Sequence, residues 1–292
     1  MLFIEIYKSL RPQQWIKNLF IFAPLVFSQN LGNWPVVVKA SGAFLIFCLL
    51  SGSLYILNDI KDLEEDRLHP KKSKRPLASG RLRKDYAITV FFLFFSAGLL
   101  LSLTLNFAFF VCALIYAVLQ VGYSFFFKHI VIVDVFIIAA GFLIRVIAGG
   151  LAIEVEISPW LLLCTILLAL FLAMSKRRHE IILLEKNAEN HRPILREYHP
   201  YLLDQMIAVV TASTVISYCL YTISEETVAK FGTTRLIYTV PFVLYGIFRY
   251  LYIVHQKKEG GSPEAIIIKD RPLLVDIFLW IVSIVVILYM KG

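Results

Sequence analysis

The sequence predicts an all-α polytopic membrane protein, with about nine transmembrane helices in a single domain over residues 1–292. Hydrophobic residues make up 59% of the chain and charged residues 17%, whereas a soluble globular protein has about 45–50% and about 25%. The mean hydropathy is +0.73, and long apolar runs recur along the whole chain. These observations exclude a disordered chain, a nucleic-acid-binding domain and an ordinary cytosolic enzyme.

Each predicted span is a run long and apolar enough to cross a bilayer as a helix, which takes about 20 residues. No segment rich in Gly or Ser separates the runs, so we expect one domain. The predicted spans are residues 15–30, 36–57, 85–105, 107–127, 130–152, 159–175, 204–224, 235–255 and 273–290.

The spans differ in the features that bound or interrupt them. Pro24 interrupts the first run, and an acidic segment follows the second. A tight turn at Leu105 and Asn106 separates the third from the fourth. The fifth span contains Arg145, a basic run follows the sixth, and the eighth contains Arg249.

Basic residues gather on one side of the predicted bundle. Of the 29 Lys and Arg residues, 23 lie in the N-terminal segment or in the loops after the second, fourth, sixth and eighth spans. By the positive-inside rule, this side is cytoplasmic in an inner, or plasma, membrane. The net charge of +8 is therefore mainly a consequence of topology. The N-terminus lacks a signal-peptide pattern.

An acidic cluster ends the second span. Asn58, Asp59, Asp62 and Asp66 form the pattern N-D-x-x-D-x-x-x-D, which on one helix places the aspartates on one face. Crowded carboxylates repel each other unless a cation neutralises them, and hard oxygen ligands suit Mg²⁺. The alternative is a solvated loop, which explains Glu64 and Glu65. It does not explain the spacing, or the basic run that follows at His69, Lys71, Lys72, Lys74 and Arg75.

This motif, in a chain with about nine spans, resembles the UbiA superfamily of intramembrane prenyltransferases. The resemblance implies a helical bundle with cytoplasmic cap loops that binds a polyprenyl diphosphate through Mg²⁺ and two aspartate-rich motifs. At the position of the second motif this chain has Ser175 to Glu180, S-K-R-R-H-E.

Further segments are similar to one branch of the superfamily, the decaprenyl-phosphate phosphoribosyltransferases. That branch joins phosphoribosyl diphosphate to a polyprenyl phosphate and releases diphosphate, as a pentosyltransferase of cell-wall biosynthesis. The matching segments are R-P-x-Q-W-x-K-N (11–18), N-D-x-x-D-x-E-x-D-R-x-H-P-x-K-x-x-R-P (58–76), Y-S-x-x-x-K-H-x-x-x-x-D-V (123–135), G-F-x-x-R-x-x-A-G (141–149), S-K-R-R-H-E (175–180) and P-F-V-L-Y-G-I-F-R-Y (241–250).

The implied reaction assigns roles to residues. Asp59, Asp62 and Asp66 are expected to bind Mg²⁺ and act in catalysis, with Asn58 on the metal or the ribose. A diphosphate and two further phosphates on the two substrates need many cations, and the chain supplies them. The expected substrate contacts are Lys17, Asn58, Lys72, Arg75, Tyr123, Lys128, Arg145, Lys176, Arg177 and Arg178.

Several alternatives stay open. Arg145, about 15 Å into the fifth span from Asp134, either contacts a phosphate or forms a structural ion pair. Glu180 either pairs with the neighbouring arginines or adds a metal ligand. The protein as a whole could instead transfer a prenyl group, or be a transporter, although transporters usually bind at the midplane between repeats. The expected partners are the two substrates and the lipid bilayer, without nucleic acid, and the sequence leaves a homo-oligomer open.

Overall fold

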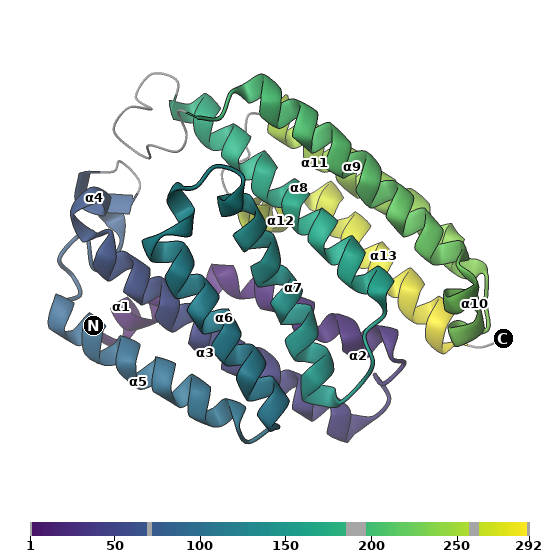
Figure 1. The fold of residues 1–292 in the computed structure, drawn as a ribbon, viewed down its shortest axis with the longest axis horizontal. Coiled ribbons are helices and arrows are strands. Elements are labelled where there is room, and N and C mark those ends of the chain that lie inside the picture. Colours follow the sequence, from purple (N-terminus) through teal and green to yellow (C-terminus); the bar gives the residue numbers. More distant parts are fainter. Residues whose placement is uncertain (1, 69–71, 185–196, 257–262, 291–292) are drawn as a thin grey trace. The chain divides into compact units, whose positions relative to one another are not determined.

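The computed structural model describes residues 2–68, 72–184, 197–256 and 263–290, all helical or connecting segments in Figure 1. His69 and Lys71 lie outside the described residues, and so do residues 185–196 of the polar segment 185–198, for which a cap over the site and a simple connector were both open. The helices are α1 (Leu2–Ser9), η1 (Pro12–Phe22), α2 (Ala23–Phe27), α3 (Trp34–Lys61), α4 (Leu63–Leu68), η2 (Lys72–Lys74), α5 (Lys84–Ser102), α6 (Phe107–Phe125), η3 (Phe127–His129), α7 (Val133–Ile153), α8 (Pro159–Leu184), α9 (Pro200–Ile223), α10 (Glu225–Phe231), η6 (Arg235–Thr239), α11 (Val240–His255), α12 (Pro263–Lys269) and α13 (Arg271–Tyr289).

Within the described ranges, eight helices are long and apolar enough to cross a membrane, and they confirm eight of the predicted spans. The first predicted span, 15–30, differs. It consists of the 11-residue 3₁₀ helix η1 followed by the five-residue helix α2. A 3₁₀ helix rises about 2.0 Å per residue, so the two together would extend about 30 Å on one axis, the thickness of the hydrocarbon core.

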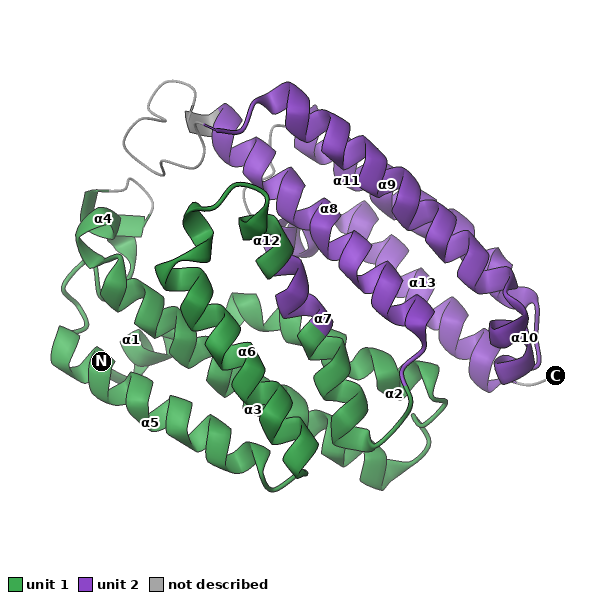
Figure 2. Cartoon of the chain, in the orientation of Figure 1, with its two compact units in different colours: residues 1–137, 144–156 green, residues 138–143, 157–292 purple. Residues whose placement is uncertain are grey.

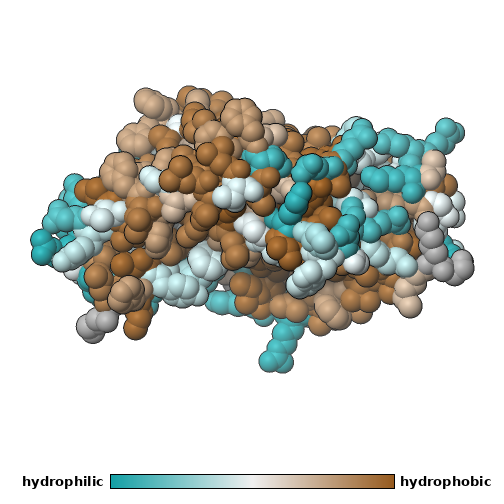
Figure 3. Space-filling model, turned by 90° about the horizontal axis from the view of Figure 1, so that it is seen from below, coloured by the Kyte–Doolittle hydropathy of each residue, from teal (hydrophilic) through white to brown (hydrophobic). Residues whose placement is uncertain are grey.

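The chain divides into two compact units (Figure 2). Unit 1 comprises Met1–Ile137 and Ile144–Glu156, and unit 2 comprises Ile138–Leu143 and Ile157–Gly292. The expectation of one domain over 1–292 stays a prediction. On the face shown in Figure 3, hydrophobic residues occupy most of the surface. Large apolar side chains are exposed in both units, among them Phe107 at 72% and Phe278 at 61%. Such a surface is what a bilayer requires of a spanning bundle.

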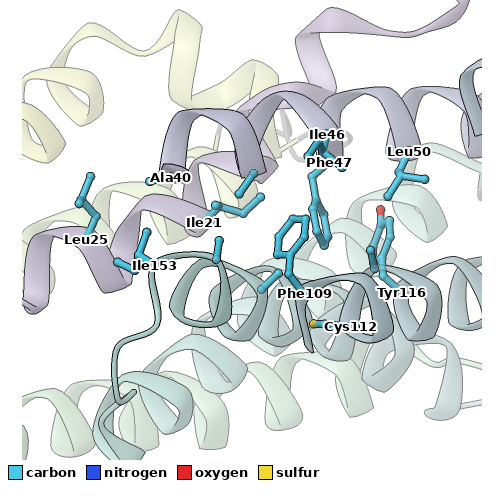
Figure 4. Close-up of a cluster of buried hydrophobic side chains, with 14 of the residues drawn as sticks. Ile21, Leu25, Ala40, Ile46, Phe47, Leu50, Phe109, Cys112, Tyr116 and Ile153 are labelled. Atoms are coloured by element: carbon cyan, nitrogen blue, oxygen red, sulfur yellow. The ribbon is translucent and has the colours of Figure 1, made fainter. Parts of the chain in front are cut away.

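The core of unit 1 lies between η1, α2, α3, α6 and α7. Figure 4 shows Ile21 and Leu25 beside Ala40 of α3 and Ile153 of α7, and Phe47 facing Phe109 and Tyr116. The Phe47 ring lies 5.8 Å from that of Phe109 and 5.1 Å from that of Tyr116.

One glycine permits α7 to approach η1. A Cβ added to Gly149 would collide with the backbone carbonyl of Ile21, so only hydrogen fits at this position. The motif G-F-x-x-R-x-x-A-G therefore ends in a residue that packing requires.

In unit 2, α8 packs against α9, and α11 packs against α13. The hydroxyl of Tyr218 on α9 makes a 2.7 Å hydrogen bond with Thr239 and accepts one of 3.0 Å from Trp280. Arg249 of α11 donates to both carboxylate oxygens of Asp270 at 3.0 and 2.9 Å. Asp270 also caps α13 through the Leu273 amide at 3.0 Å, so Arg249 fixes a helix start.

Candidate functional site

The three aspartates lie in unit 1, at the end of α3 that is predicted to face the cytoplasm. Asp59 is in α3, Asp62 follows it, and Asp66 is in α4. Helix α3 ends at Lys61, and Asp62 is its C-cap, with φ −89° and ψ 16°. The expected single helix is therefore interrupted at Asp62. Two backbone hydrogen bonds nevertheless keep the helical i to i−4 pattern across the junction of α3 and α4. The Asp62 amide donates to the Asn58 carbonyl at 2.9 Å, and the Asp66 amide donates to the Asp62 carbonyl at 2.8 Å.

Burial separates the aspartates from the neighbouring glutamates. Asp59, Asp62 and Asp66 are 4%, 6% and 1% exposed, whereas the Glu64 side chain is 79% exposed. Glu64 accepts a hydrogen bond from the exposed Arg67 at 3.0 Å. The glutamates form the solvated face, and the aspartates form an interior site.

Asp59 is paired with two guanidinium groups. Arg11, which precedes η1, donates to Asp59 Oδ1, and Arg75 Nη1 donates to the same oxygen at 3.0 Å. The Arg11 guanidinium also lies over the Tyr55 ring, 4.9 Å from its centroid. A carboxylate with so little water around it requires such partners.

Asp66 and Asp62 are held by other basic residues. Asp66 Oδ2 accepts from Arg75, and Lys72 Nζ lies 3.3 Å from Asp66 Oδ1. Lys128 of η3 donates to Asp62 Oδ1 at 2.8 Å, and Asn58 donates to Asp62 Oδ2 at 3.2 Å. The structure thus brings Lys72, Arg75 and Lys128, three of the expected phosphate contacts, to the aspartates.

The donor set fits Mg²⁺ in chemistry. Three buried carboxylates and an amide oxygen are hard ligands, and Asp66 Oδ1 is a buried oxygen that accepts no hydrogen bond from the described residues. Within the described ranges, however, no three acidic, His or Cys side chains converge closely enough to hold a metal ion. Each of the three carboxylates is in an ion pair with a basic side chain, so a metal ion would compete with these partners for the carboxylate oxygens.

A second polar group surrounds Arg145 of α7, which is 4% exposed. Its Nε donates to Asn18 Oδ1 at 2.7 Å and its Nη2 to the Tyr116 hydroxyl at 2.8 Å. Asn18, fully buried, also donates to Ser51 Oγ at 3.2 Å. Asn18 and Tyr116 are neutral side chains, and their two hydrogen bonds orient the Arg145 guanidinium.

Two further expected contacts lie in unit 1. Lys17 Nζ donates to Gln14 within η1 at 2.6 Å, and the side chain is half-buried. Tyr123 is half-buried in the last turn of α6, next to Ser124, whose carbonyl accepts from Lys61.

The remaining expected contacts, Lys176, Arg177 and Arg178, lie on α8 in unit 2. Arg177 donates to Glu180 Oε2 at 2.5 Å, which favours the first of the two roles left open for Glu180. Arg178 donates to both oxygens of Asp204 on α9, at 3.2 Å for the Nη2 contact, and His255 Nε2 lies 3.3 Å from Asp204 Oδ1. Arg178 therefore ties α8 to α9, and the role of all three in substrate binding stays a prediction.

The site assignment from sequence omitted Arg11 and Asn18. Arg11 begins and Asn18 ends the segment R-P-x-Q-W-x-K-N, and this motif was the sequence feature that could have identified them. Its residues are more than 40 positions from Asp59, and spacing alone does not pair them.

The fold and site define a polytopic helical membrane protein with buried aspartates and basic residues gathered at the end of a spanning helix. The sequence profile of the UbiA prenyltransferase family matches residues 19–282, and the chain belongs to that family. Family membership confirms the resemblance seen in the sequence and favours an enzyme over a transporter.

Two curated relatives are similar over nearly the whole chain. The decaprenyl-phosphate phosphoribosyltransferase of Corynebacterium glutamicum is 34% identical, over 97% of this chain and 86% of the relative. The enzyme of that name from Mycolicibacterium smegmatis is also 34% identical, over 95% of this chain and 90% of the relative.

Solved structures support the fold. A UbiA homolog from Archaeoglobus fulgidus, bound to DMAPP and Mg²⁺, has a TM-score of 0.73 at 19% identity, over 98% of this chain and all of that one. A structure that concerns the biosynthesis of digeranylgeranylglyceryl phosphate synthase in membranes has a TM-score of 0.67 at 19% identity, over 99% of each chain.

Proposed function

We propose that this protein transfers 5-phosphoribosyl from phosphoribosyl diphosphate to a polyprenyl phosphate and releases diphosphate. Two of its curated relatives are named decaprenyl-phosphate phosphoribosyltransferase. The reaction would take place at the cytoplasmic side of the membrane, where the basic segments are predicted to lie. Support comes from similarity of about one residue in three over nearly the full chain.

The charge balance at the aspartates carries the proposal. Among the described residues, three buried carboxylates are in ion pairs with four basic side chains, which leaves one positive charge in excess before any substrate is present. Such an excess in a partly buried site favours a polyanion. The basic members are Arg11, Lys72, Arg75 and Lys128.

Asp59, Asp62 and Asp66 would hold Mg²⁺, with Asn58 as a fourth ligand or a ribose contact. When bound, Mg²⁺ supplies positive charge to the diphosphate as it leaves. Arg75 and Lys72, which pair with Asp66, would bind the outer oxygens of the same diphosphate by charge-assisted hydrogen bonds.

The chemistry exchanges one bond for another at the ribose. The C1–O bond to diphosphate breaks, and the diphosphate keeps the electron pair. A phosphate oxygen of the polyprenyl phosphate forms the new C1–O bond. The acceptor is already anionic, because the second pKa of a phosphate monoester is about 6, so no side chain has to act as a general base.

Arg145 suits the lipid phosphate. Its guanidinium is buried in α7 among Asn18 and Tyr116, which hold its direction through hydrogen bonds of 2.7 and 2.8 Å. An intramembrane charge commonly marks a substrate path. We assign Arg145 to the acceptor and leave the diphosphate to the aspartate cluster.

The second candidate function is transfer of a prenyl group from its diphosphate to an aromatic or other small acceptor. One observation favours it: the solved structure of the family with a TM-score of 0.73 is bound to DMAPP and Mg²⁺. Against it, the position of the second aspartate motif holds S-K-R-R-H-E in this chain, with Arg178 committed to Asp204.

The test offers purified protein and Mg²⁺ two donor–acceptor pairs in parallel. One pair is radiolabelled phosphoribosyl diphosphate with a polyprenyl phosphate, and the other is labelled prenyl diphosphate with an aromatic acid. Label from the first pair in the lipid phase supports the proposal. Reaction of the second pair alone would establish prenyl transfer instead.

A further inference from the structure

Arg11 has a backbone conformation that side-chain-bearing residues rarely adopt. Its φ is 52° and its ψ is 65°, in the left-handed region, at the N-cap of η1. The next residue, Pro12, disfavours helical backbone before it and favours extended backbone. This conformation therefore persists only because other contacts of Arg11 determine it, which is common at functional sites.

Two of those contacts are backbone hydrogen bonds, in which the Arg11 amide donates to the Lys8 carbonyl at 3.1 Å and the Arg11 carbonyl accepts from the Gln14 amide at 2.8 Å. The side chain adds two more. The guanidinium donates to Asp59 Oδ1 and lies 4.9 Å from the centroid of the Tyr55 ring. The Arg11 side chain is 22% exposed, while that of Asp59 is only 5% exposed. Arg11 is thus the more exposed partner in a pair with a buried carboxylate.

Asp59 Oδ1 is shared between two cations. Arg75 Nη1 donates to it at 3.0 Å and also pairs with Asp66, so Asp59 retains a positive partner when Arg11 leaves. A guanidinium has five N–H donors, and the described contact with one oxygen leaves Arg11 able to bind another anion. Arg11 is therefore the more easily exchanged of the two.

We propose that Arg11 is a substrate-binding residue that changes partner: it neutralises Asp59 until Mg²⁺ and the donor diphosphate bind, and then turns to the diphosphate. This inference rests on the proposed function and deepens it. The guanidinium and a divalent cation compete for the same carboxylate oxygen, and the arriving diphosphate gives Arg11 a new anion. Neither buried charge is left without compensation during the exchange.

The exchange predicts effects of opposite sign in one variant. Arg11→Gln removes the competitor, so Mn²⁺ alone should bind about tenfold more tightly. The same variant lacks a charge-assisted contact, so inorganic diphosphate in saturating Mg²⁺ should bind about tenfold more weakly. Mn²⁺ binding is measured by electron paramagnetic resonance and diphosphate binding by calorimetry, on the purified full chain.

Two variants serve as controls. Arg83→Gln removes the same charge from an exposed pair with Asp85 and should change neither affinity. Arg11→Lys keeps the positive charge but lacks the planar, bidentate set of guanidinium donors. It should restore most of the competition with Mn²⁺ but less of the affinity for diphosphate. Thermal unfolding of each variant verifies that it folds. If Arg11→Gln does not fold, the comparison of Arg11→Lys with the wild-type protein provides the test.

The outcomes distinguish this inference from the proposed function. Equal weakening of both ligands, or no change in either, would overturn the exchange and leave Arg11 a structural residue, while phosphoribosyl transfer by the wild-type protein would still stand. Failure of the wild-type protein to bind Mn²⁺ or diphosphate at all would overturn both.

Discussion

At the scale of single residues, burial sorts the acidic segment into two sets. The three aspartates face inward to basic partners, whereas Glu64 and Arg67 form an exposed pair with 79% and 50% of their side chains accessible. Only the first set can act on a substrate away from bulk water, where electrostatic interactions are strong. This division gives each active-site variant a control a few residues away.

Asp62→Asn should abolish most of the activity. The substitution keeps the shape of the side chain but removes the negative charge that Lys128 contacts at 2.8 Å, and with it one oxygen ligand for Mg²⁺. Loss of a group that stabilises charge in the transition state lowers turnover by about 100- to 1000-fold. Glu64→Gln, measured in the same transfer assay, should retain full turnover; equal losses in both variants would remove Asp62 from the site.

Asn18→Leu should destabilise the fold around Arg145. It removes the acceptor of a 2.7 Å hydrogen bond from a guanidinium that is 4% exposed. Leaving a buried charged donor unsatisfied costs about 2 kcal/mol, or about 4–8 °C in unfolding temperature for a chain of this size. Tyr116→Phe removes only a hydroxyl and should cost about half as much. An unchanged unfolding temperature in Asn18→Leu would show that Arg145 does not depend on this contact.

At the scale of elements, the spans could be predicted from apolar runs, but the conformation of the first could not. Hydropathy does not distinguish a 3₁₀ helix from an α-helix, and η1 owes its position to packing on α3 and to the approach of Gly149 in α7. The interruption at Asp62 could not be predicted either, because the spacing of the aspartates fits one continuous helix as well as it fits the two helices α3 and α4.

Gly149→Ala tests the approach of α7 to η1. The added methyl group would collide with the backbone of Ile21, and backbone cannot rotate away as a side chain can. We expect a loss of about 3 kcal/mol or more in the free energy of unfolding, seen as a lower unfolding temperature and less folded protein. Gly42→Ala, whose new Cβ would lie 3.9 Å from Leu105, should be neutral or slightly stabilising. Similar behaviour of the two variants would contradict the close packing.

At the scale of the whole molecule, the sequence could predict the membrane class, the family and one half of the site. It identified the aspartates and the basic residues near them in the chain, because Asp66, Lys72 and Arg75 are close in sequence. It did not pair Arg11 with Asp59, or Arg178 with Asp204, since such pairs depend on which helices become neighbours. The family's shared segments supplied what spacing could not.

The orientation of the molecule can be tested with single cysteines. Ser79 and Gly32 are both exposed and follow the second and first predicted spans, on opposite predicted sides. The positive-inside rule predicts that a membrane-impermeant maleimide labels Gly32→Cys in intact cells and labels Ser79→Cys only after permeabilisation. The reverse pattern would place the aspartate cluster on the outer side, away from a cytoplasmic sugar diphosphate.

In the proposed reaction, phosphoribose moves to the lipid and diphosphate leaves. The most direct measurement follows both products of one reaction, with ¹⁴C in the ribose and ³²P in the β-phosphate of the donor, on purified protein with Mg²⁺ and a polyprenyl phosphate. We expect equal molar amounts of ¹⁴C in the lipid phase and of ³²P-diphosphate in the water phase, and neither product after chelation of the metal. Diphosphate released without ribose in the lipid would contradict it.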